Sequence, residues 1–278
     1  MTAAAATDVP VAVPSGPPVE FRSLLASEWT KIRSVRSTMW ALVLLFVLTL
    51  GFTTLITGLT AAQWSDQSTS DRQSVIDDTV SFILGAGFQL SQLTICVLGV
   101  LVIASEYTTG MIRASLLAVP KRIPMLAAKS TVFGMLVFVV GLLVAFPSFF
   151  LGAAILHSHA PVSLGDPGVF RAVVGAALYL TVLGLFALAI GALLRQTAAG
   201  ITGVVGFVLV LAPLAQLLPG SLGKHVHAYL PSEAGQLIAR AHQNKDDLLS
   251  PWQGFGVFCL WTAVLLLAAA YFLKRRDA

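Results

Sequence analysis

Long apolar runs alternate with short polar segments along most of the chain. A helix needs about 20 consecutive, mostly apolar residues to cross a bilayer. Six segments meet this requirement, so the pattern predicts an all-α integral membrane protein with six transmembrane helices. The predicted spans are residues 39–60, 81–104, 130–155, 170–193, 197–218 and 252–273.

Composition supports the same class. Of the 278 residues, 56% are hydrophobic and only 11% are charged, whereas soluble domains average about 25% charged residues. The 17 Lys and Arg residues lie mostly beside apolar runs, where membrane topology explains them better than nucleic-acid binding does. Cys96 and Cys259 both fall inside apolar runs, so we expect no disulfide framework and no metal or redox role for them.

The basic residues also predict the orientation of the spans. With the N-terminus in the cytoplasm, twelve of the 17 Lys and Arg residues fall in cytoplasmic segments and five fall outside. Positively charged loops stay on the cytoplasmic side, and an even number of spans returns the chain to that side. We therefore expect a multi-pass protein with both termini in the cytoplasm.

Two segments precede the first span. Residues 1–19 are rich in Ala, Pro and Val, which predicts a disordered cytoplasmic tail rather than a secretory signal. Residues 20–38 predict an amphipathic helix on the cytoplasmic surface, ahead of the six-span domain of residues 39–278. Its apolar arc consists of Phe21, Leu25, Trp29, Ile32, Val35 and Met39, with Arg22, Lys31 and Arg33 flanking or opposing it.

Glu28 falls near the centre of this apolar arc and interrupts the pattern. One interpretation is an interfacial helix whose Glu28 reaches water or pairs with Lys31 or Arg36. The other is that this face meets a second protein, in which Glu28 pairs with a basic residue. The sequence leaves both interpretations open.

Motifs of catalysis and ion transport are missing from the sequence. It contains no phosphate-binding loop, no zinc-protease motif, no CxxC pair and no nucleophile elbow. No Asp, Glu or Lys lies in the middle of a predicted span, which argues against a proton- or sodium-coupled carrier. The histidines fall in predicted outside segments without Cys or carboxylate at ligand spacing, so polar loop residues are favoured over a metal site. They are His157, His159, His225, His227 and His242.

Neutral polar residues do occur inside the predicted spans. Gln89, Gln92 and Thr94 lie in the second span, and Gln216 lies near the outer end of the fifth. Gln89 and Gln92 are three residues apart and are expected to share a helix face. They either form hydrogen bonds between helices or line a substrate path at a subunit interface.

Two segments between spans carry helical patterns too short to cross a membrane. Within residues 104–122, Gly110 and Pro120 bracket a stretch of about two helical turns. We expect a short cytoplasmic helix there, which a soluble partner binds; the alternative is a plain connecting loop. Within residues 219–251, we expect a short helix at or dipping into the outer leaflet, and the alternative is an ordered outside loop.

Four segments together resemble a known family. They are "EWTKIRSVRSTMW" before span 1, "SEYTTGMIRASLLAVPKR" between spans 2 and 3, "YLPSEAGQ" before span 6 and the closing "KRRDA". In this order and at these positions they resemble the permeases of type-2 ABC exporters, most of all the actinobacterial subgroup. The resemblance covers nearly the whole chain from residue 20 onward.

The resemblance implies a protein of the bacterial plasma membrane with a connecting helix over 20–38, a coupling helix between spans 2 and 3, and re-entrant helices before span 6. The coupling helix docks on an ABC ATP-binding subunit, present in two copies, which binds ATP and Mg²⁺ in place of this chain. A second permease subunit completes a homodimer or heterodimer. The residues carried over are Glu106, Tyr107, Gly110, Ile112 and Arg113 for coupling, and Glu28, Trp29, Lys31, Arg33 and Arg36 in the connecting helix. Thr108 departs from the pattern, since many relatives have Arg there.

The sequence therefore predicts the membrane subunit of an ATP-driven exporter with no ATPase site of its own. The neutral lining of the predicted path favours an amphiphilic substrate such as a drug, an antibiotic peptide or a lipid. One alternative is an ABC-like membrane sensor or assembly factor that does not transport. A polytopic membrane enzyme is a further alternative, for which the sequence shows no converging catalytic set.

Overall fold

The structure is a computed structural model, and it describes residues 20–111, 122–217, 219–244 and 247–275. These residues form helices joined by turns and short loops, with no β-strand among them. Five helices are long and apolar enough to cross a membrane, which confirms the predicted class of helical membrane protein. They are α2 (Arg36–Ala62), α4 (Thr79–Thr108), α6 (Arg122–Leu156), α7 (Val169–Leu194) and α12 (Pro251–Arg275).

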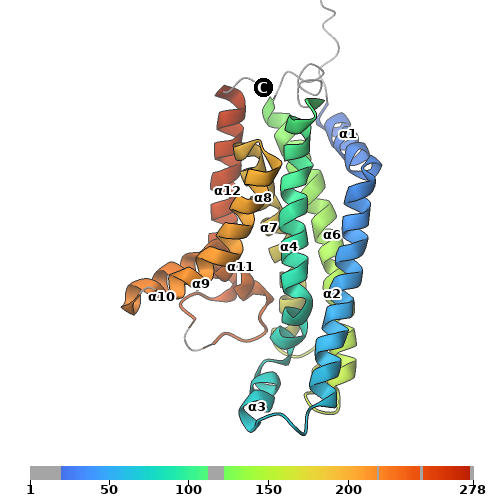
Figure 1. Cartoon of the computed structure of the whole chain (residues 1–278), viewed down its shortest axis with the longest axis vertical. Coiled ribbons are helices and arrows are strands. Elements are labelled where there is room, and N and C mark those ends of the chain that lie inside the picture. Colours follow the sequence, from blue (N-terminus) through green and yellow to red (C-terminus); the bar gives the residue numbers. More distant parts are fainter. Residues whose placement is uncertain (1–19, 112–121, 218, 245–246, 276–278) are drawn as a thin grey trace, which may run out of the picture.

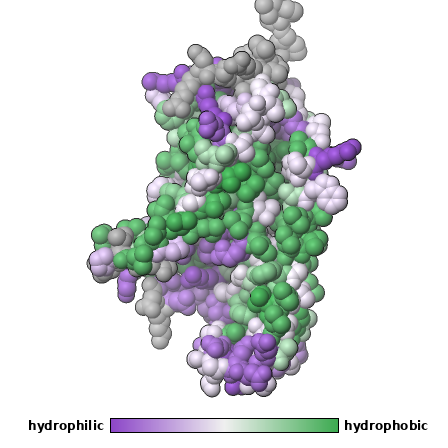
Figure 2. All heavy atoms as spheres, in the orientation of Figure 1, coloured by the Kyte–Doolittle hydropathy of each residue, from purple (hydrophilic) through white to green (hydrophobic). Residues whose placement is uncertain are grey.

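The five helices run along the long axis of the molecule (Figure 1). α7 is the central helix, because it packs against α4, α6 and α12 and many of its residues are buried. α1 (Phe21–Ser34) and the last turns of α12 lie at one end, and α3 (Thr69–Asp77) lies at the other. We call these the α1 end and the α3 end. Figure 2 shows mostly apolar surface over the middle of the viewed face and polar side chains at both ends.

Close helix packing depends on small residues, and the contact between α4 and α7 illustrates this. A Cβ atom added to Gly99 of α4 would lie 2.6 Å from the carbonyl oxygen of Gly184 in α7. Any side chain at Gly99 would therefore push the two backbones apart. Small residues at such contacts are typical of membrane helix bundles.

α1 and α2 are separate helices. Val35 adopts an extended backbone conformation between them, with φ −83° and ψ 100°. The structure thus divides the helix predicted over residues 20–38, since α1 ends at Ser34 and residues 36–38 begin the first span. α1 packs mainly against α6.

α6 begins earlier than the predicted span of residues 130–155. It starts at Arg122, and Pro124 lies in its first turn, where a backbone N–H would have no partner within the helix. Proline therefore does not break the helix at this position. As a consequence, Lys129, which the sequence analysis counted with the cytoplasmic loop, lies inside α6 and is buried.

The predicted fifth span, residues 197–218, is not one straight helix. α8 (Thr197–Val205) continues through a π-helical turn (Gly206–Val210) into α9 (Leu211–Gln216), and α10 (Gly220–Tyr229) follows. π-helical turns and prolines bend helices, and Pro213 lies in α9. α8 packs against α4 and α7, whereas α9 and α10 project sideways from the bundle (Figure 1).

The segment before the last helix is largely helical and packs inside the bundle. α11 (Pro231–Gln236) and the 3₁₀ turn Leu237–Ala239 contact α7 and α12, and Ala234 and Ile238 are fully buried. Gly175 of α7 permits this approach, because a Cβ there would collide with the carbonyl oxygen of Ile238. The structure thus favours the predicted short helix over a plain loop in this segment.

Candidate functional site

Four charged side chains from three helices meet inside the α1 end of the bundle. Lys129 of α6 is at the centre: its Nζ donates to Glu28 Oε2 of α1 at 2.5 Å and to Glu106 Oε1 of α4 at 2.8 Å. Lys31 of α1 donates to Glu28 Oε1 at 2.7 Å and lies 3.4 Å from Glu106 Oε1. We call these four residues the charged cluster.

The charged cluster is shielded from solvent, but not uniformly. Lys129, Glu28 and Glu106 are 1%, 2% and 5% exposed, whereas the Lys31 side chain is 31% exposed. Buried charges are costly unless they are paired and hydrogen-bonded. Here two ammonium groups balance two carboxylates, so the cluster as a whole is neutral.

Helical periodicity directs Glu28 into the bundle. Leu24, Glu28 and Ile32 follow one another at four-residue spacing and are the buried residues of α1, because positions i and i+4 share a helix face. Leu24 and Ile32 therefore flank Glu28 with apolar contacts. Phe21 and Trp29 are 46% and 47% exposed, so the buried stripe is narrower than the predicted apolar arc.

The neighbouring charges determine how the α1 members ionise. Burial alone would raise the pKa of the Glu28 carboxyl, but Lys129 and Lys31 outweigh this effect and lower the pKa below its ordinary value. Burial alone would lower the pKa of the Lys31 ammonium, but Glu28 and Glu106 outweigh it and raise the pKa. Both groups are therefore charged around neutral pH.

The residues around the charged cluster hold the ends of four helices together. Arg195 lies 5.2 Å from the ring centroid of Tyr107, which connects the end of α7 to the end of α4. Arg122 donates to the carbonyl oxygen of Leu273 at 2.8 Å, which connects α6 to α12. Gly110 follows α4 with φ 72°, a left-handed conformation that glycine adopts readily at helix ends.

A cavity of about 460 Å³ adjoins the charged cluster, between α1, α2 and α4. Lys31, Glu106 and Lys129 contribute to its wall, and apolar side chains such as Ala41 and Leu98 line much of the rest. The charged cluster therefore lies between this cavity and the interior of the bundle.

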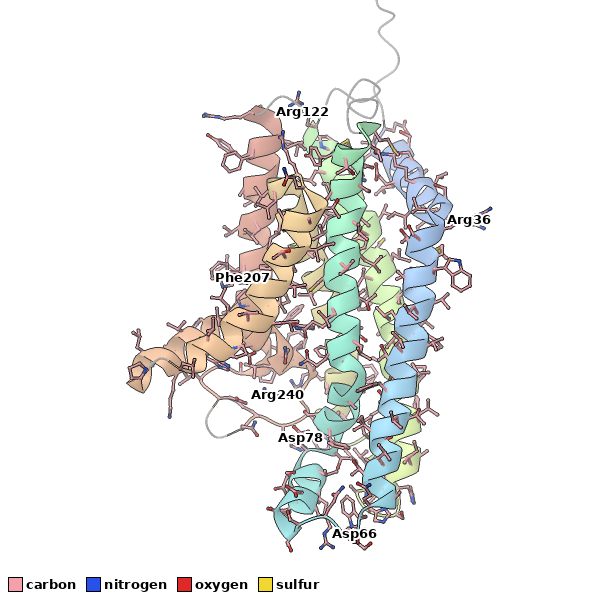
Figure 3. The ribbon with its side chains drawn as sticks, viewed as in Figure 1. Arg36, Asp66, Asp78, Arg122, Phe207 and Arg240 are labelled. Carbon is pink, nitrogen blue, oxygen red and sulfur yellow. The ribbon has the colours of Figure 1, made fainter. Side chains whose placement is uncertain are left out.

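The connecting-helix residues divide between buried and exposed positions. Glu28 pairs with Lys31, as one of the two interpretations predicted, and it also pairs with Lys129 of α6. Arg33 and Arg36 are exposed, and Figure 3 shows Arg36 projecting away from the bundle.

Three of the five predicted coupling residues lie together at the end of α4. Glu106 belongs to the charged cluster, Tyr107 contacts Arg195, and Gly110 ends the helix. Ile112 and Arg113, together with the rest of the predicted coupling helix, lie outside the described residues.

The predicted path residues do not share one environment. Gln92 is 1% exposed, and its Oε1 lies 3.5 Å from Nε2 of Gln236 in α11, an arrangement that fits hydrogen bonding between helices. Gln89 is exposed, and Thr94 lines the cavity. The side chain of Gln216 lies outside the described ones.

Lys129 is the functional residue that the sequence analysis missed. The residues three and four positions away on both sides are apolar and buried, namely Met125, Leu126, Val132 and Phe133. A lysine in the centre of an apolar helix face is the signal that was available. It was overlooked because the predicted third span began at residue 130, one residue after Lys129.

No protein-family model matches the chain, and no curated protein matches it significantly. The fold and the site therefore define a class: a helical membrane protein with a buried charged cluster at one end of its bundle.

Proposed function

We propose that the chain is the permease subunit of an ATP-driven exporter of the type-2 ABC kind, in which two copies of a separate subunit hydrolyse ATP. The position of the charged cluster carries this proposal. The cluster joins α1 and α6 to α4 at Glu106, about one helical turn before Gly110. The segment that follows Gly110 is the proposed docking site of the ATP-binding subunit.

The distribution of charge supports a cytoplasmic location for the α1 end. Basic residues gather there and acidic residues gather at the α3 end, as the positive-inside rule expects. An ATP-binding subunit in the cytoplasm would then meet the end that carries the charged cluster. The basic residues are Arg22, Lys31, Arg33, Arg36, Arg122, Arg195, Lys274 and Arg275, and the acidic ones are Asp66, Asp71, Asp77 and Asp78.

We propose that the bent run from α8 to α10 makes the sixth crossing, with α11 and its 3₁₀ turn as re-entrant helices. α7 ends at the α1 end, since Arg195 contacts Tyr107 there. α12 also ends there, so the chain between α7 and α12 travels toward the α3 end before it returns. A break within a membrane helix is tolerated where protein covers the backbone, and Phe207 of the π-helical turn packs against Phe186 and Trp261.

An amphiphilic substrate is supported by the polar surface beneath the arm that α9 and α10 form. Polar side chains gather there within an otherwise apolar face (Figure 2), and Arg240 lies below the same arm (Figure 3). Arg240 Nη1 is 3.4 Å from Asp247 Oδ1, and Gln236, which is partly exposed, is neutral. Such a surface offers hydrogen bonds with little excess charge, which suits a molecule with a polar head and an apolar body.

The test is to express the chain together with an ABC ATP-binding subunit from the same genome and to purify both in mild detergent. We expect the two to co-purify, and the reconstituted complex to hydrolyse ATP faster in the presence of an amphiphilic dye that it moves across proteoliposomes. A catalytically inactive ATP-binding subunit is the control and should abolish movement of the dye. Repeated isolation of the chain alone would contradict the proposal. Stimulated ATP hydrolysis without movement of any substrate would instead favour a sensor or assembly factor.

A further inference from the structure

We propose that Lys129 is the positioning residue through which α1, α4 and α6 move as one unit at the α1 end. The inference rests on the proposed function. It identifies the side-chain contact through which a movement of the proposed docking segment, the residues that follow Gly110, would reach the membrane-spanning helices. It assigns this role to one lysine and its two carboxylate partners.

Lys129 is the point at which the three helices are joined. Its ammonium group binds one carboxylate of α1 and one of α4, although Glu28 and Glu106 lie 101 and 23 residues away in the sequence. α1 packs against α6 and α2, but it is not among the helices that pack closely on α4. The ion pairs through Lys129 and Lys31 therefore form the main connection between α1 and α4 in the described part of the chain.

Charge makes this connection stiffer than apolar packing would. The hydrophobic effect is non-directional, so apolar burial by itself does not select one pair of side chains as the contact between two helices. Charge-assisted hydrogen bonds are short and directional. Withdrawing Lys129 from both carboxylates would leave its ammonium group unpaired in a site with little solvent, which is strongly unfavourable.

The three helices that Lys129 joins either are membrane spans, as α4 and α6 are, or continue into one, as α1 does into α2. Glu106 lies about one turn before Gly110, so a displacement of the docking segment reaches it first. Glu28 lies in α1, which continues through Val35 into α2. Lys129 lies in the early turns of α6. A displacement that starts beyond Gly110 is therefore transmitted to α2 and α6 as well as to α4.

The experiment separates this role from a purely structural one. The triple variant Glu28→Gln, Lys129→Met and Glu106→Gln removes the three buried charges together, so that no buried charge is left unpaired and the fold is expected to be retained. Lys31 keeps its charge, but part of its side chain reaches solvent. The matched control is Asp66→Asn, Asp77→Asn and Lys274→Met, which neutralises two carboxylates and one lysine at exposed positions. Both are compared with the wild-type chain and with Lys129→Arg, in proteoliposomes that contain the ATP-binding subunit.

We expect the triple variant to insert, to keep a melting temperature near that of the wild type and to hydrolyse ATP. The number of dye molecules moved per ATP should fall by about two- to thirty-fold, the range typical of mutations within a coupling network. The control triple variant should match the wild type, and Lys129→Arg should retain most of the coupling because it keeps the charge.

A triple variant that moves as much dye per ATP as the wild type would overturn the inference and leave the proposed function intact. A wild-type complex that shows no ATP-driven movement would overturn the proposed function instead. Should the triple variant fail to accumulate, Glu28→Asp keeps the charge but withdraws the carboxylate by one methylene. Unchanged coupling in Glu28→Asp would likewise overturn the inference.

Discussion

Lys129 depends on its partners more than any other charged residue in the described part of the chain. It is almost fully buried, and its ammonium group contacts two carboxylates. Lys31 contacts the same two carboxylates, but part of its side chain reaches solvent. The two lysines have the same partners and differ in burial. Replacing each in turn therefore shows how burial changes the contribution of a charged lysine to stability.

We predict that Lys129→Met lowers the free energy of unfolding by about 3–5 kcal/mol, because it leaves two buried carboxylates with one half-exposed lysine. Lys31→Met should cost about 1 kcal/mol or less, since Lys129 still pairs with both carboxylates and ion pairs of partly exposed lysines contribute little. Melting temperatures of the purified variants, measured at one scan rate, compare the two. Equal losses would show that burial does not determine the effect.

The stability of the protein should also depend on acid through Glu28. Its pKa is lowered from the ordinary value of 4.5, so the stabilisation that it contributes is complete above that value and is lost as the pH falls through the lowered pKa. The pKa of Lys31 is raised from 10.5, so its contribution is lost only as the pH rises above 10.5. We predict a plateau of stability between these limits.

Glu28→Gln is the variant that checks the acid side of this prediction. We expect the melting temperature of the wild type to fall more steeply below about pH 4.5 than that of Glu28→Gln, which has no carboxylate to protonate at this position. The comparison requires melting curves across the acid range for both proteins. Parallel curves would assign the acid sensitivity to other carboxyl groups.

At the scale of elements, the glycine that ends α4 is favoured by its backbone conformation and not by a lack of room for a side chain. A Cβ atom added to Gly110 or to Gly51 of α2 would contact nothing within 4 Å. The two glycines differ in that Gly110 has φ 72°, whereas Gly51 lies within a helix. Only Gly110 therefore resists a side chain for conformational reasons.

We predict that Gly110→Ala costs about 1–2 kcal/mol of backbone strain and reduces transport per ATP hydrolysed, because the chain leaves α4 in a changed direction. Gly51→Ala should be neutral or slightly stabilising, since alanine is the better helix former by about 1 kcal/mol. Melting temperature and coupled transport are measured on both variants. A fully coupled Gly110→Ala would show that the direction of the chain after α4 is unimportant.

At the scale of the whole molecule, the proposed topology makes the two ends accessible from opposite sides of the membrane. We predict that a cysteine replacing Arg33 at the α1 end reacts with a membrane-impermeant maleimide only when the membrane is opened or inverted. Cysteines replacing Asp66 or Asn244 should react in intact cells. Asn244 follows α10 and α11, so its exposure to the outside tests the sixth crossing.

The parent protein for this labelling should have Cys96 and Cys259 replaced by alanine, because Cys259 is partly exposed. Reaction of Arg33→Cys in intact cells would reverse the proposed orientation. An Asn244→Cys that reacts only after the membrane is opened would leave the chain with five crossings.

Much of the bundle was predictable because a helix that crosses a bilayer needs an apolar run of about 20 residues. The predicted spans 170–193 and 252–273 correspond closely to α7 and α12, since an apolar run of the required length has few alternatives in a membrane. The start of α6 was not predicted, because the apolar run that marks the span begins later than the helix, and the proline near Arg122 lies in the first turn, where it is tolerated. The bend in the fifth segment was also missed, although Gly206 and Pro213 were visible in the sequence.

The sequence alone determined the membrane class and the approximate position of most spans, because these depend on local hydrophobicity, whereas it left the environment of Glu28 open. Only the tertiary structure placed Lys129 between Glu28 and Glu106. Such a contact joins residues far apart in the chain, and no local pattern encodes which buried charge meets which. The buried charge of Lys129 has to be compensated by carboxylates, and the packing of α1 and α4 against α6 supplies them.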